Sequence, residues 1–231
     1  MDFVWVVHGD EYAALCAKSI ETVRRHNEDA RCCVYSDRKY ASLDKKANYY
    51  EVVEGYHDVP FMLMNVLCQS KHLFHMEPSD TVCFLDVDAF MVKELPDMER
   101  DWDVAPTWRD NMGQLSDLMP YNYGVIFARA TIQAMCGWLW MADHITHQTE
   151  DRKKWYGNQV ALRELCGPPV EGIQVRDHSY FDIRVKPLPC TKWNWTPDDD
   201  NPKVSPSGHY FVHFKGNRKD LADWYHERCV A

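Results

Sequence analysis

The sequence contains few glycines and lacks the glycine-rich motifs of the common nucleotide-binding folds. Its ten glycines form neither a G-x-G-x-x-G fingerprint nor a G-x-x-x-x-G-K-[ST] phosphate loop, which excludes the usual dinucleotide and P-loop classes. No apolar run approaches the roughly 20 residues that a membrane span requires. The N-terminus has no basic region or small-residue cleavage site of a signal peptide. We therefore expect a soluble, cytoplasmic protein with no membrane span.

Metal-binding cysteine pairs are also missing. The chain has nine cysteines but no C-x-x-C pair, so a structural zinc site is not indicated. An odd number leaves at least one thiol unpaired if disulfides form, and most cysteines lie in apolar runs. We expect buried, reduced thiols.

An excess of positive charge is absent as well. The 26 basic and 35 acidic residues give a net charge of −9, which argues against strong non-specific binding to nucleic acid or anionic membranes. The 231 residues, 45% of them hydrophobic, suffice for one substantial core. We therefore predict a single globular domain spanning residues 1–231.

Apolar runs and helical spacing alternate along the chain, which is typical of an α/β protein with a doubly wound sheet. The predicted strands cover residues 3–7, 31–35, 50–53, 82–85, 102–106, 122–129, 173–176, 180–185 and 210–214. The predicted helices cover residues 12–25, 60–74, 131–144 and 219–229, with another starting at Gly157 and an irregular loop over 188–207. We expect Asp10 to cap the first helix.

The stretch from Asp80 to Val92 carries the strongest chemical signal. The apolar run Val82–Leu85 predicts a buried strand, and Asp86 and Asp88 follow it directly. Ligands of α/β proteins bind at the carboxyl ends of the strands. Two neighbouring carboxylates there need a counter-charge, and oxygen ligands suit Mg²⁺ or Mn²⁺.

Several separated motifs occur in one order together with this Asp-x-Asp pair. They are Asp10-Glu11-Tyr12, Lys71, Asn122-Tyr123-Gly124, Gly157-Asn158-Gln159, Leu188-Pro189 with Asn194, and His213-x-x-Gly216-x-x-Lys219. The last motif lies roughly 125 residues after the aspartates, and joint occurrence makes the pattern specific. Over most of its length the chain resembles the GT-A-fold retaining glycosyltransferases of the glycogenin and lipopolysaccharide galactosyltransferase-like family.

The resemblance implies a GT-A fold, a single Rossmann-like α/β/α domain with a mixed central sheet. Its nucleotide-binding half would cover about residues 1–95 and its sugar and acceptor half about residues 96–231. Asp86, Asp88 and His213 would hold Mn²⁺ or Mg²⁺, with Asp86 also reaching the ribose. The donor would be a nucleotide sugar, expected to be UDP-linked.

The resemblance also assigns the remaining site residues. Gly216, Lys219 and Lys71 would contact the donor, with the lysines acting as point charges on phosphate or sugar oxygens. Tyr12 would stack on the base, in a pocket lined by His8 and Val7. The expected sugar-facing residues are Asn122, Asn158 and Gln159. Attack of the acceptor on the front face would retain the anomeric configuration.

Each of these residues also has a purely structural interpretation. Asp86 and Asp88 are equally suited to a strand-end cap and a surface ion pair, His213 to a satisfied core position, and Lys71 to a snorkelling helix lysine. Tyr12 fits a hydrophobic staple. Asn122 and Gln159 fit a strand-start turn and an ordinary helix start.

The sequence leaves alternatives open for the function. The family usually has aspartate where this chain has Asn158, which favours a catalytically weak nucleotide-sugar-binding module as one alternative. A phosphatase of the haloacid-dehalogenase type also uses Asp-x-Asp, but its pair lies near the N-terminus and is followed by Thr or Val, where this chain has Ala89. The acceptor, the sugar and the oligomeric state cannot be derived. Candidate acceptors are a saccharide, a protein, a small alcohol, or a hydroxylated DNA base as in virus-encoded DNA-modifying transferases.

Overall fold

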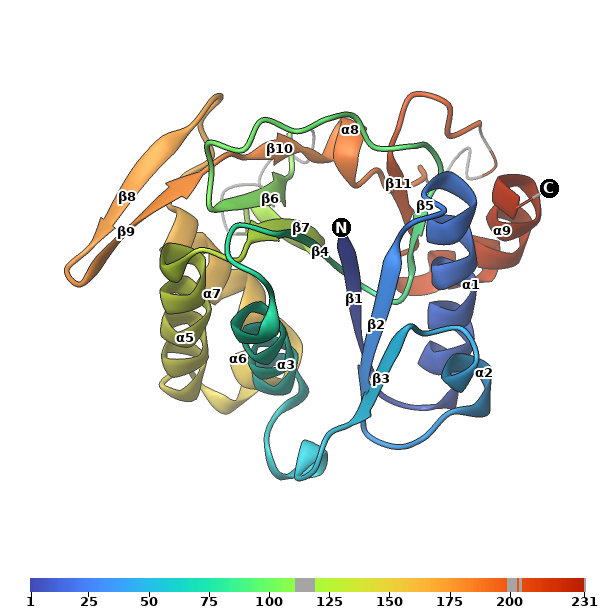
Figure 1. The fold of residues 1–231 in the computed structure, drawn as a ribbon, viewed down its shortest axis with the longest axis horizontal. Coiled ribbons are helices and arrows are strands. Elements are labelled where there is room, and N and C mark those ends of the chain that lie inside the picture. The colour runs from blue at the N-terminus through green and yellow to red at the C-terminus, as the bar shows by residue number, and fades with distance from the viewer. Residues whose placement is uncertain (111–118, 199–202, 204, 231) are drawn as a thin grey trace.

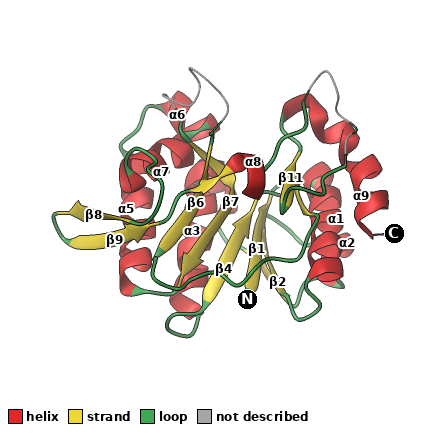
Figure 2. Cartoon of the chain, turned by 90° about the horizontal axis from the view of Figure 1, so that it is seen from above, coloured by secondary structure: helices red, strands yellow, loops and turns green. Residues whose placement is uncertain are grey.

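The computed structural model describes residues 1–110, 119–198, 203 and 205–230. In this part of the chain nine strands form one mixed sheet that lies between two layers of helices (Figures 1 and 2). Across the sheet the strands are β3 (Tyr49–Val52), β2 (Arg31–Ser36), β1 (Asp2–Val7), β4 (Thr81–Leu85), β7 (Tyr121–Arg129), β6 (Val104–Trp108), β9 (Phe181–Val185) and β8 (Gln174–His178), with β10 (Leu188–Pro189) beside β6.

Alternating side chains of the central strands fill two separate cores. On β1 the side chains of Phe3 and Trp5 pack on one face of the sheet, whereas Val4 and Val6 pack on the other. This alternation is the two-residue period of an extended strand. A strand that is apolar at every position therefore serves both layers, as expected for a doubly covered sheet.

One helical layer covers the face that carries Phe3 and Trp5. It contains α1 (Asp10–His26), the short α2 (Ala41–Asp44) and α9 (Ala222–Val230), which lie together in both views (Figures 1 and 2). Gly9 stands at the start of α1, and the Asp10 carboxylate accepts a hydrogen bond from Arg38 at 2.7 Å instead of capping the helix. The predicted Asp10 cap is therefore wrong.

The second helical layer covers the opposite face. It contains α3 (Phe61–His75), α5 (Ile132–Thr146), α6 (Glu150–Trp155) and α7 (Gly157–Cys166), and a 3₁₀ turn, η1 (Tyr56–Asp58), precedes it. No helix in the described ranges is long and apolar enough to cross a bilayer. The eight cysteines described there are all free thiols, as predicted, and seven of them are buried.

A small second sheet brings the late part of the chain to the middle. Strand β5 (Ala89–Met91) follows β4 and pairs antiparallel with β11 (Phe211–His213), so that Ala89 lies opposite His213. The segment predicted as an irregular loop contains β10 and the single helical turn α8 (Cys190–Trp193). A 3₁₀ segment, η2 (Gly216–Leu221), then leads from β11 to α9. Residues 199–202 and 204 of the predicted loop lie outside the described residues.

Candidate functional site

Strand β4 ends at the carboxyl edge of the sheet and delivers the two aspartates there. It runs parallel to β1 and antiparallel to β7. Immediately after β4 the backbone NH of Asp86 donates to the carbonyl of Gly124 at 2.9 Å, and the NH of Ala89 donates to the carbonyl of Asp86 at 3.1 Å. This tight turn holds Asp86 and Asp88 beside the first residues of β7.

Strand β11 brings His213 to the same place from a distant part of the chain. The backbone NH of Phe214 donates to the carbonyl of Asp88 at 2.9 Å, and the NH of His213 donates to the carbonyl of Trp195 at 2.8 Å. Pairing of β11 with β5 therefore brings the backbone of His213 next to the aspartates by main-chain hydrogen bonds.

The three side chains converge on one point. His213 Nε2 lies 3.1 Å from Asp88 Oδ1 and 3.5 Å from Asp86 Oδ2. One ligand atom from each of the three residues lies within 4.8 Å of the other two. Two carboxylate oxygens and one imidazole nitrogen form a donor set that suits Mn²⁺ or Mg²⁺. The residues present therefore fit the divalent cation that the sequence predicts.

A chain of hydrogen bonds fixes the tautomer of His213. The hydroxyl of Thr107 lies 3.0 Å and 2.9 Å from the carbonyl oxygens of Asn122 and Val125, which can only accept. The Thr107 hydroxyl therefore donates its proton toward these carbonyls, and its oxygen accepts a hydrogen bond from Asn194 Nδ2 at 2.9 Å. Asn194 Oδ1 then faces His213 Nδ1 at 3.1 Å and accepts its proton. In the neutral ring this leaves the lone pair on Nε2, directed at the carboxylates.

The space for the imidazole depends on a glycine. A Cβ atom added at Gly124 would lie 2.1 Å from His213 Cε1 and 3.1 Å from Asp86 Oδ2. Any other residue at this position would push the imidazole away. This steric clash explains why the Asn122-Tyr123-Gly124 motif ends in glycine.

The two aspartates differ in protonation behaviour. Loss of hydration and the nearby Asp88 carboxylate raise the pKa of Asp86, although His213 opposes this. Burial also acts to raise the pKa of Asp88, but the charge and hydrogen bond of His213 outweigh it, so the pKa of Asp88 is lowered. Asp88 therefore stays ionised to a lower pH than Asp86. Burial, reinforced by Arg109, lowers the pKa of Lys215 to about 8.

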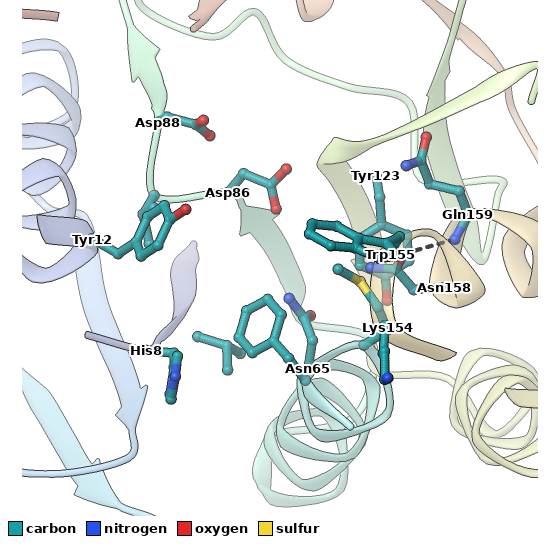
Figure 3. Close-up of a pocket in the computed structure, with 14 residues that line it drawn as sticks. His8, Tyr12, Asn65, Asp86, Asp88, Tyr123, Lys154, Trp155, Asn158 and Gln159 are labelled. Carbon is teal, nitrogen blue, oxygen red and sulfur yellow. Dashed lines mark hydrogen bonds between the residues drawn. The ribbon is translucent and has the colours of Figure 1, made fainter. Parts of the chain in front are cut away.

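A cavity of about 410 Å³ lies next to the aspartates, and Figure 3 shows its lining. Tyr12 and His8 form one side of it, together with Val6 and Phe61. The His8 ring stacks on Tyr56 with the centroids 5.6 Å apart. These rings provide flat apolar surfaces of the kind that bind a nucleobase.

The opposite side of the cavity is formed by the start of α7 (Figure 3). Asn158 is buried, and its Oδ1 accepts from the backbone NH of Gln159 at 2.8 Å. Gln159 Oε1 accepts from the guanidinium of Arg109 at 2.8 Å. Because the arginine engages the amide oxygen, the amide NH₂ of Gln159 is the group left to donate into the cavity.

Lys219 approaches the aspartates from η2. Its ammonium lies 4.0 Å from Asp88 Oδ2 and 4.2 Å from the centre of the Tyr12 ring. Gly216, at the start of η2, has a φ of 57°, a left-handed conformation that favours glycine, and a Cβ there would meet nothing within 4 Å. Gly216 therefore supplies the turn that returns Lys219 to the site.

Three predicted site residues lie elsewhere. Lys71 forms an ion pair with Glu51 at the edge of the sheet, and its place on α3 does not bring it to the cavity. The side chain of Val7 points into the core beneath α1, so Val6 lines the cavity in its place. Asn122 is buried, its Oδ1 accepts from the NH of Gly124 at 3.2 Å, and it borders a neighbouring cavity.

The sequence patterns missed several residues of the site. Lys154 and Trp155 precede the Gly157-Asn158-Gln159 motif and line the cavity, with the Trp155 side chain 74% exposed. A tryptophan in an otherwise polar stretch is the one sequence signal that could have identified Trp155. Asn65 also lines the cavity, but nothing in its sequence context distinguishes it from the other residues of its helix.

Comparison with solved structures identifies the architecture as the GT-A fold of glycosyltransferases. The galactosyltransferase LgtC, solved with donor and acceptor sugar analogs, matches 100% of this chain over 94% of its own length, with a TM-score of 0.60 and 14% identity. A glycosyltransferase involved in glycosylating the major capsid of PBCV-1 matches over 98% of both chains, with a TM-score of 0.59 and 13% identity.

GlyE from Streptococcus pneumoniae TIGR4 is a further match, with a TM-score of 0.62 and 12% identity. This chain spans 60% of the GlyE structure. No protein-family profile and no curated protein sequence matches the chain. The predicted α/β GT-A fold is thus confirmed, and at these identities the likeness concerns the fold.

Proposed function

We propose that this protein is a metal-dependent glycosyltransferase that moves a sugar from a nucleoside-diphosphate donor, UDP-linked, to a hydroxyl acceptor with retention of configuration. The observation that carries the proposal is the convergence of Asp86, Asp88 and His213 beside a cavity bordered by aromatic rings and by Gln159. The GT-A fold of the solved glycosyltransferases supports it.

In this proposal Asp86, Asp88 and His213 hold Mn²⁺ or Mg²⁺, which supplies Lewis-acid charge for the departing diphosphate. Lys219 adds a positive charge on the same side, since its ammonium already lies near Asp88. Tyr12 and His8 receive the nucleoside. Gln159, held by Arg109, donates from its amide to the sugar and positions the anomeric carbon.

The transfer breaks the bond between the anomeric carbon and the β-phosphate oxygen. A bond then forms from the same face between that carbon and the acceptor hydroxyl oxygen. The hydroxyl proton passes to the departing diphosphate, so no separate protein base is required. The chain's own residues thereby act by binding, orientation and charge.

The first test measures the thermal stability of the protein with UDP-sugars, with and without Mn²⁺. A ligand at 100 times its Kd stabilises the folded state by about 2.7 kcal/mol. We expect such a shift to require Mn²⁺ in the wild type and to lose its Mn²⁺-dependent part in Asp88→Asn. Glu99→Gln, which changes an exposed carboxylate, serves as the control and should retain the shift. An unchanged shift in Asp88→Asn would overturn the assignment.

A catalytically weak nucleotide-sugar-binding module is the second candidate, and Asn158 is the observation that favours it. Its amide hydrogen-bonds to the backbone NH of Gln159 and brings no negative charge to the sugar side. Mn²⁺-dependent hydrolysis of a UDP-sugar without acceptor would exclude this candidate, whereas binding without turnover would support it. Release of phosphate from an aryl phosphate would instead revive the phosphatase alternative.

A further inference from the structure

A second cavity, of about 390 Å³, adjoins the metal-binding residues. Asn194 belongs to its lining and holds His213 through a hydrogen bond of 3.1 Å. Arg109 also belongs to its lining and donates to Gln159, a residue of the first cavity. The two cavities therefore share a wall made of the residues that position the metal ligand and the sugar-facing amide.

The second cavity is rich in positive charge. Arg109, Lys215 and Arg218 line it, and Asp198 is the one carboxylate among its described lining residues. Asp198 is exposed, whereas Arg109 is 9% exposed and Lys215 is half-buried. Cationic side chains of this kind are seldom buried without an anionic partner.

Neither Arg109 nor Lys215 forms an ion pair with a described carboxylate, although Asp86 and Asp88 attract Lys215 from beyond ion-pair distance. The guanidinium of Arg109 donates to the carbonyl oxygens of Met119 and Tyr121 and to the amide of Gln159, all of which are neutral. No described carboxylate lies within the 4.0 Å ion-pair distance of the Lys215 ammonium. A ligand that brings a negative charge would remove the cost of burying these cations.

The donor does not supply that charge under the proposed function. The two carboxylates would balance the divalent cation, and Lys219, which lies 4.0 Å from Asp88 and 4.2 Å from the centre of the Tyr12 ring, would accompany the diphosphate of the donor. Arg109 and Lys215 border the other cavity, where the acceptor would reach the anomeric carbon. Trp195, stacked on His209 at a centroid distance of 4.3 Å, adds an aromatic wall suited to a sugar ring.

We propose that this second cavity, bounded by Arg109, Lys215 and Trp195, binds an acceptor that carries a carboxylate or phosphate group, such as a sugar acid or a sugar phosphate. This inference rests on the proposed function, because it assigns the acceptor side of the same site. Arg109 then has two roles, since it orients Gln159 and contributes to the anion subsite.

The test uses the protein saturated with UDP and Mn²⁺, so that an added anion cannot occupy the metal. Calorimetric titration compares glucose 6-phosphate and glucuronate with glucose. We expect at least one anionic probe to bind at least tenfold more tightly than glucose, and Lys215→Met to weaken it about tenfold. Lys215→Arg should restore most of the affinity. Lys192→Met, which removes an exposed lysine of the adjacent α8, should change nothing.

Three outcomes would overturn the inference. Equal binding of glucose and both anionic probes would remove the anion subsite, and so would equal effects of Lys215→Met and Lys192→Met. A weaker affinity of Lys215→Met for UDP-glucuronate, with UDP-glucose unaffected and no loss for the acceptor probes, would place the anion on the donor sugar instead.

The same titrations separate this inference from the proposed function. Wild-type protein that fails to bind UDP with Mn²⁺ contradicts both. Protein that binds UDP with Mn²⁺ but shows no preference for the anionic probes contradicts the anion subsite alone. Retained UDP binding by Lys215→Met also shows that this variant is folded and that its metal-binding residues are intact.

Discussion

On its Nδ1 side His213 is held by neutral side chains. Asn194 is 1% exposed and hydrogen-bonds both to the imidazole and to Thr107, so its amide has no freedom to flip. Outer residues that orient a metal-binding histidine typically contribute tenfold to a hundredfold to metal affinity. Asn194 would therefore support the proposed metal site without contacting the metal itself.

Replacing Asn194 by alanine should weaken Mn²⁺ binding tenfold to a hundredfold, because His213 Nδ1 loses its acceptor and the ring can rotate. Calorimetric titration with Mn²⁺ in the presence of UDP measures the change. Asn27→Ala, at the far end of α1, serves as the control and should bind Mn²⁺ like the wild type. Equal affinities of Asn194→Ala and wild type would show that the hydrogen bond does not position His213.

Gly124 offers a second test at a single residue. Gly124→Ala should abolish measurable Mn²⁺ binding, because the new methyl group would occupy the position of His213 Cε1. Gly208→Ala is a matched control, since a Cβ there meets nothing within 4 Å. Mn²⁺ affinity and the thermal unfolding midpoint should be measured for both variants. Retained Mn²⁺ binding by a folded Gly124→Ala protein would mean that His213 is not a ligand.

At the level of single residues, the sequence predicted the ligands better than their supports. Asp86, Asp88 and His213 stood out by motif, and the structure brings them together. Arg109 and Thr107 could not be derived, because their partners lie many residues away and the contacts depend on how β6 meets α7 and α8. The ion pair of Lys71 with Glu51 could not be foreseen either, because a helical lysine gives no sign of its ion-pair partner.

At the level of elements, one buried carboxylate connects the neighbouring strands β6 and β9 with helix α5. Asp103 is 1% exposed and precedes β6. It accepts from the guanidinium of Arg184 on β9 at 2.8 and 3.0 Å, and from the hydroxyl of Thr131 at 3.0 Å. Thr131 caps α5 by accepting from the NH of Ala134. One side chain thus holds β6, β9 and the start of α5 together.

Asp103→Asn should lower the free energy of unfolding by about 2 kcal/mol at pH 7, since Arg184 loses its ionic partner while remaining partly solvated. Burial opposes the charge of Asp103, but hydrogen bonds from Arg184 lower its pKa overall. A lowered folded-state pKa stabilises the protein above the unfolded value of about 3.9 and ceases to do so as the pH falls through the folded value. The difference between wild type and variant should therefore shrink upon acidification.

Urea unfolding at pH 7 and pH 3 measures this difference. Glu99→Gln, which removes an exposed ion pair with Lys186, is the control and should leave the unfolding midpoint unchanged at both values. A gap between wild type and Asp103→Asn that stays constant with pH would contradict an ionic role for Asp103.

The order of the longer elements could be predicted from the sequence, whereas the shortest ones could not. Periodicity located α3 and α5 to within about two residues, which is the usual uncertainty of helix ends. Strand β10 has two residues and α8 has four, too few for any period to show. Both depend on contacts with β6, which no local pattern encodes.

For the whole molecule, the class of fold was predictable but the strand arrangement was not. Apolar runs indicate a covered sheet, yet they do not reveal that β7 runs antiparallel between β4 and β6. The joining of β5 with β11 depends on two segments more than a hundred residues apart. That pairing assembles the site, so the site is a property of the complete fold.

Metal binding should therefore stabilise the contact between these distant segments. The two-stranded sheet has only three paired positions, and a cation held by Asp86, Asp88 and His213 would cross-link it. Hydrogen exchange measured by mass spectrometry should show slower exchange over 86–91 and 211–221 upon addition of Mn²⁺ and UDP. A ligand at 100 times its Kd slows exchange through any opening that releases the ligand about a hundredfold.

The hairpin of β8 and β9 projects from the opposite edge of the sheet (Figure 1). Its exchange through local opening should be unchanged by Mn²⁺ and UDP, which makes residues 174–185 an internal control. Asp88→Asn should lose the protection at 86–91 and 211–221 together, because one cation would join both segments. Protection that spreads evenly over the chain, or that persists in Asp88→Asn, would mean that the ligand binds elsewhere and that the two segments are held by main-chain pairing alone.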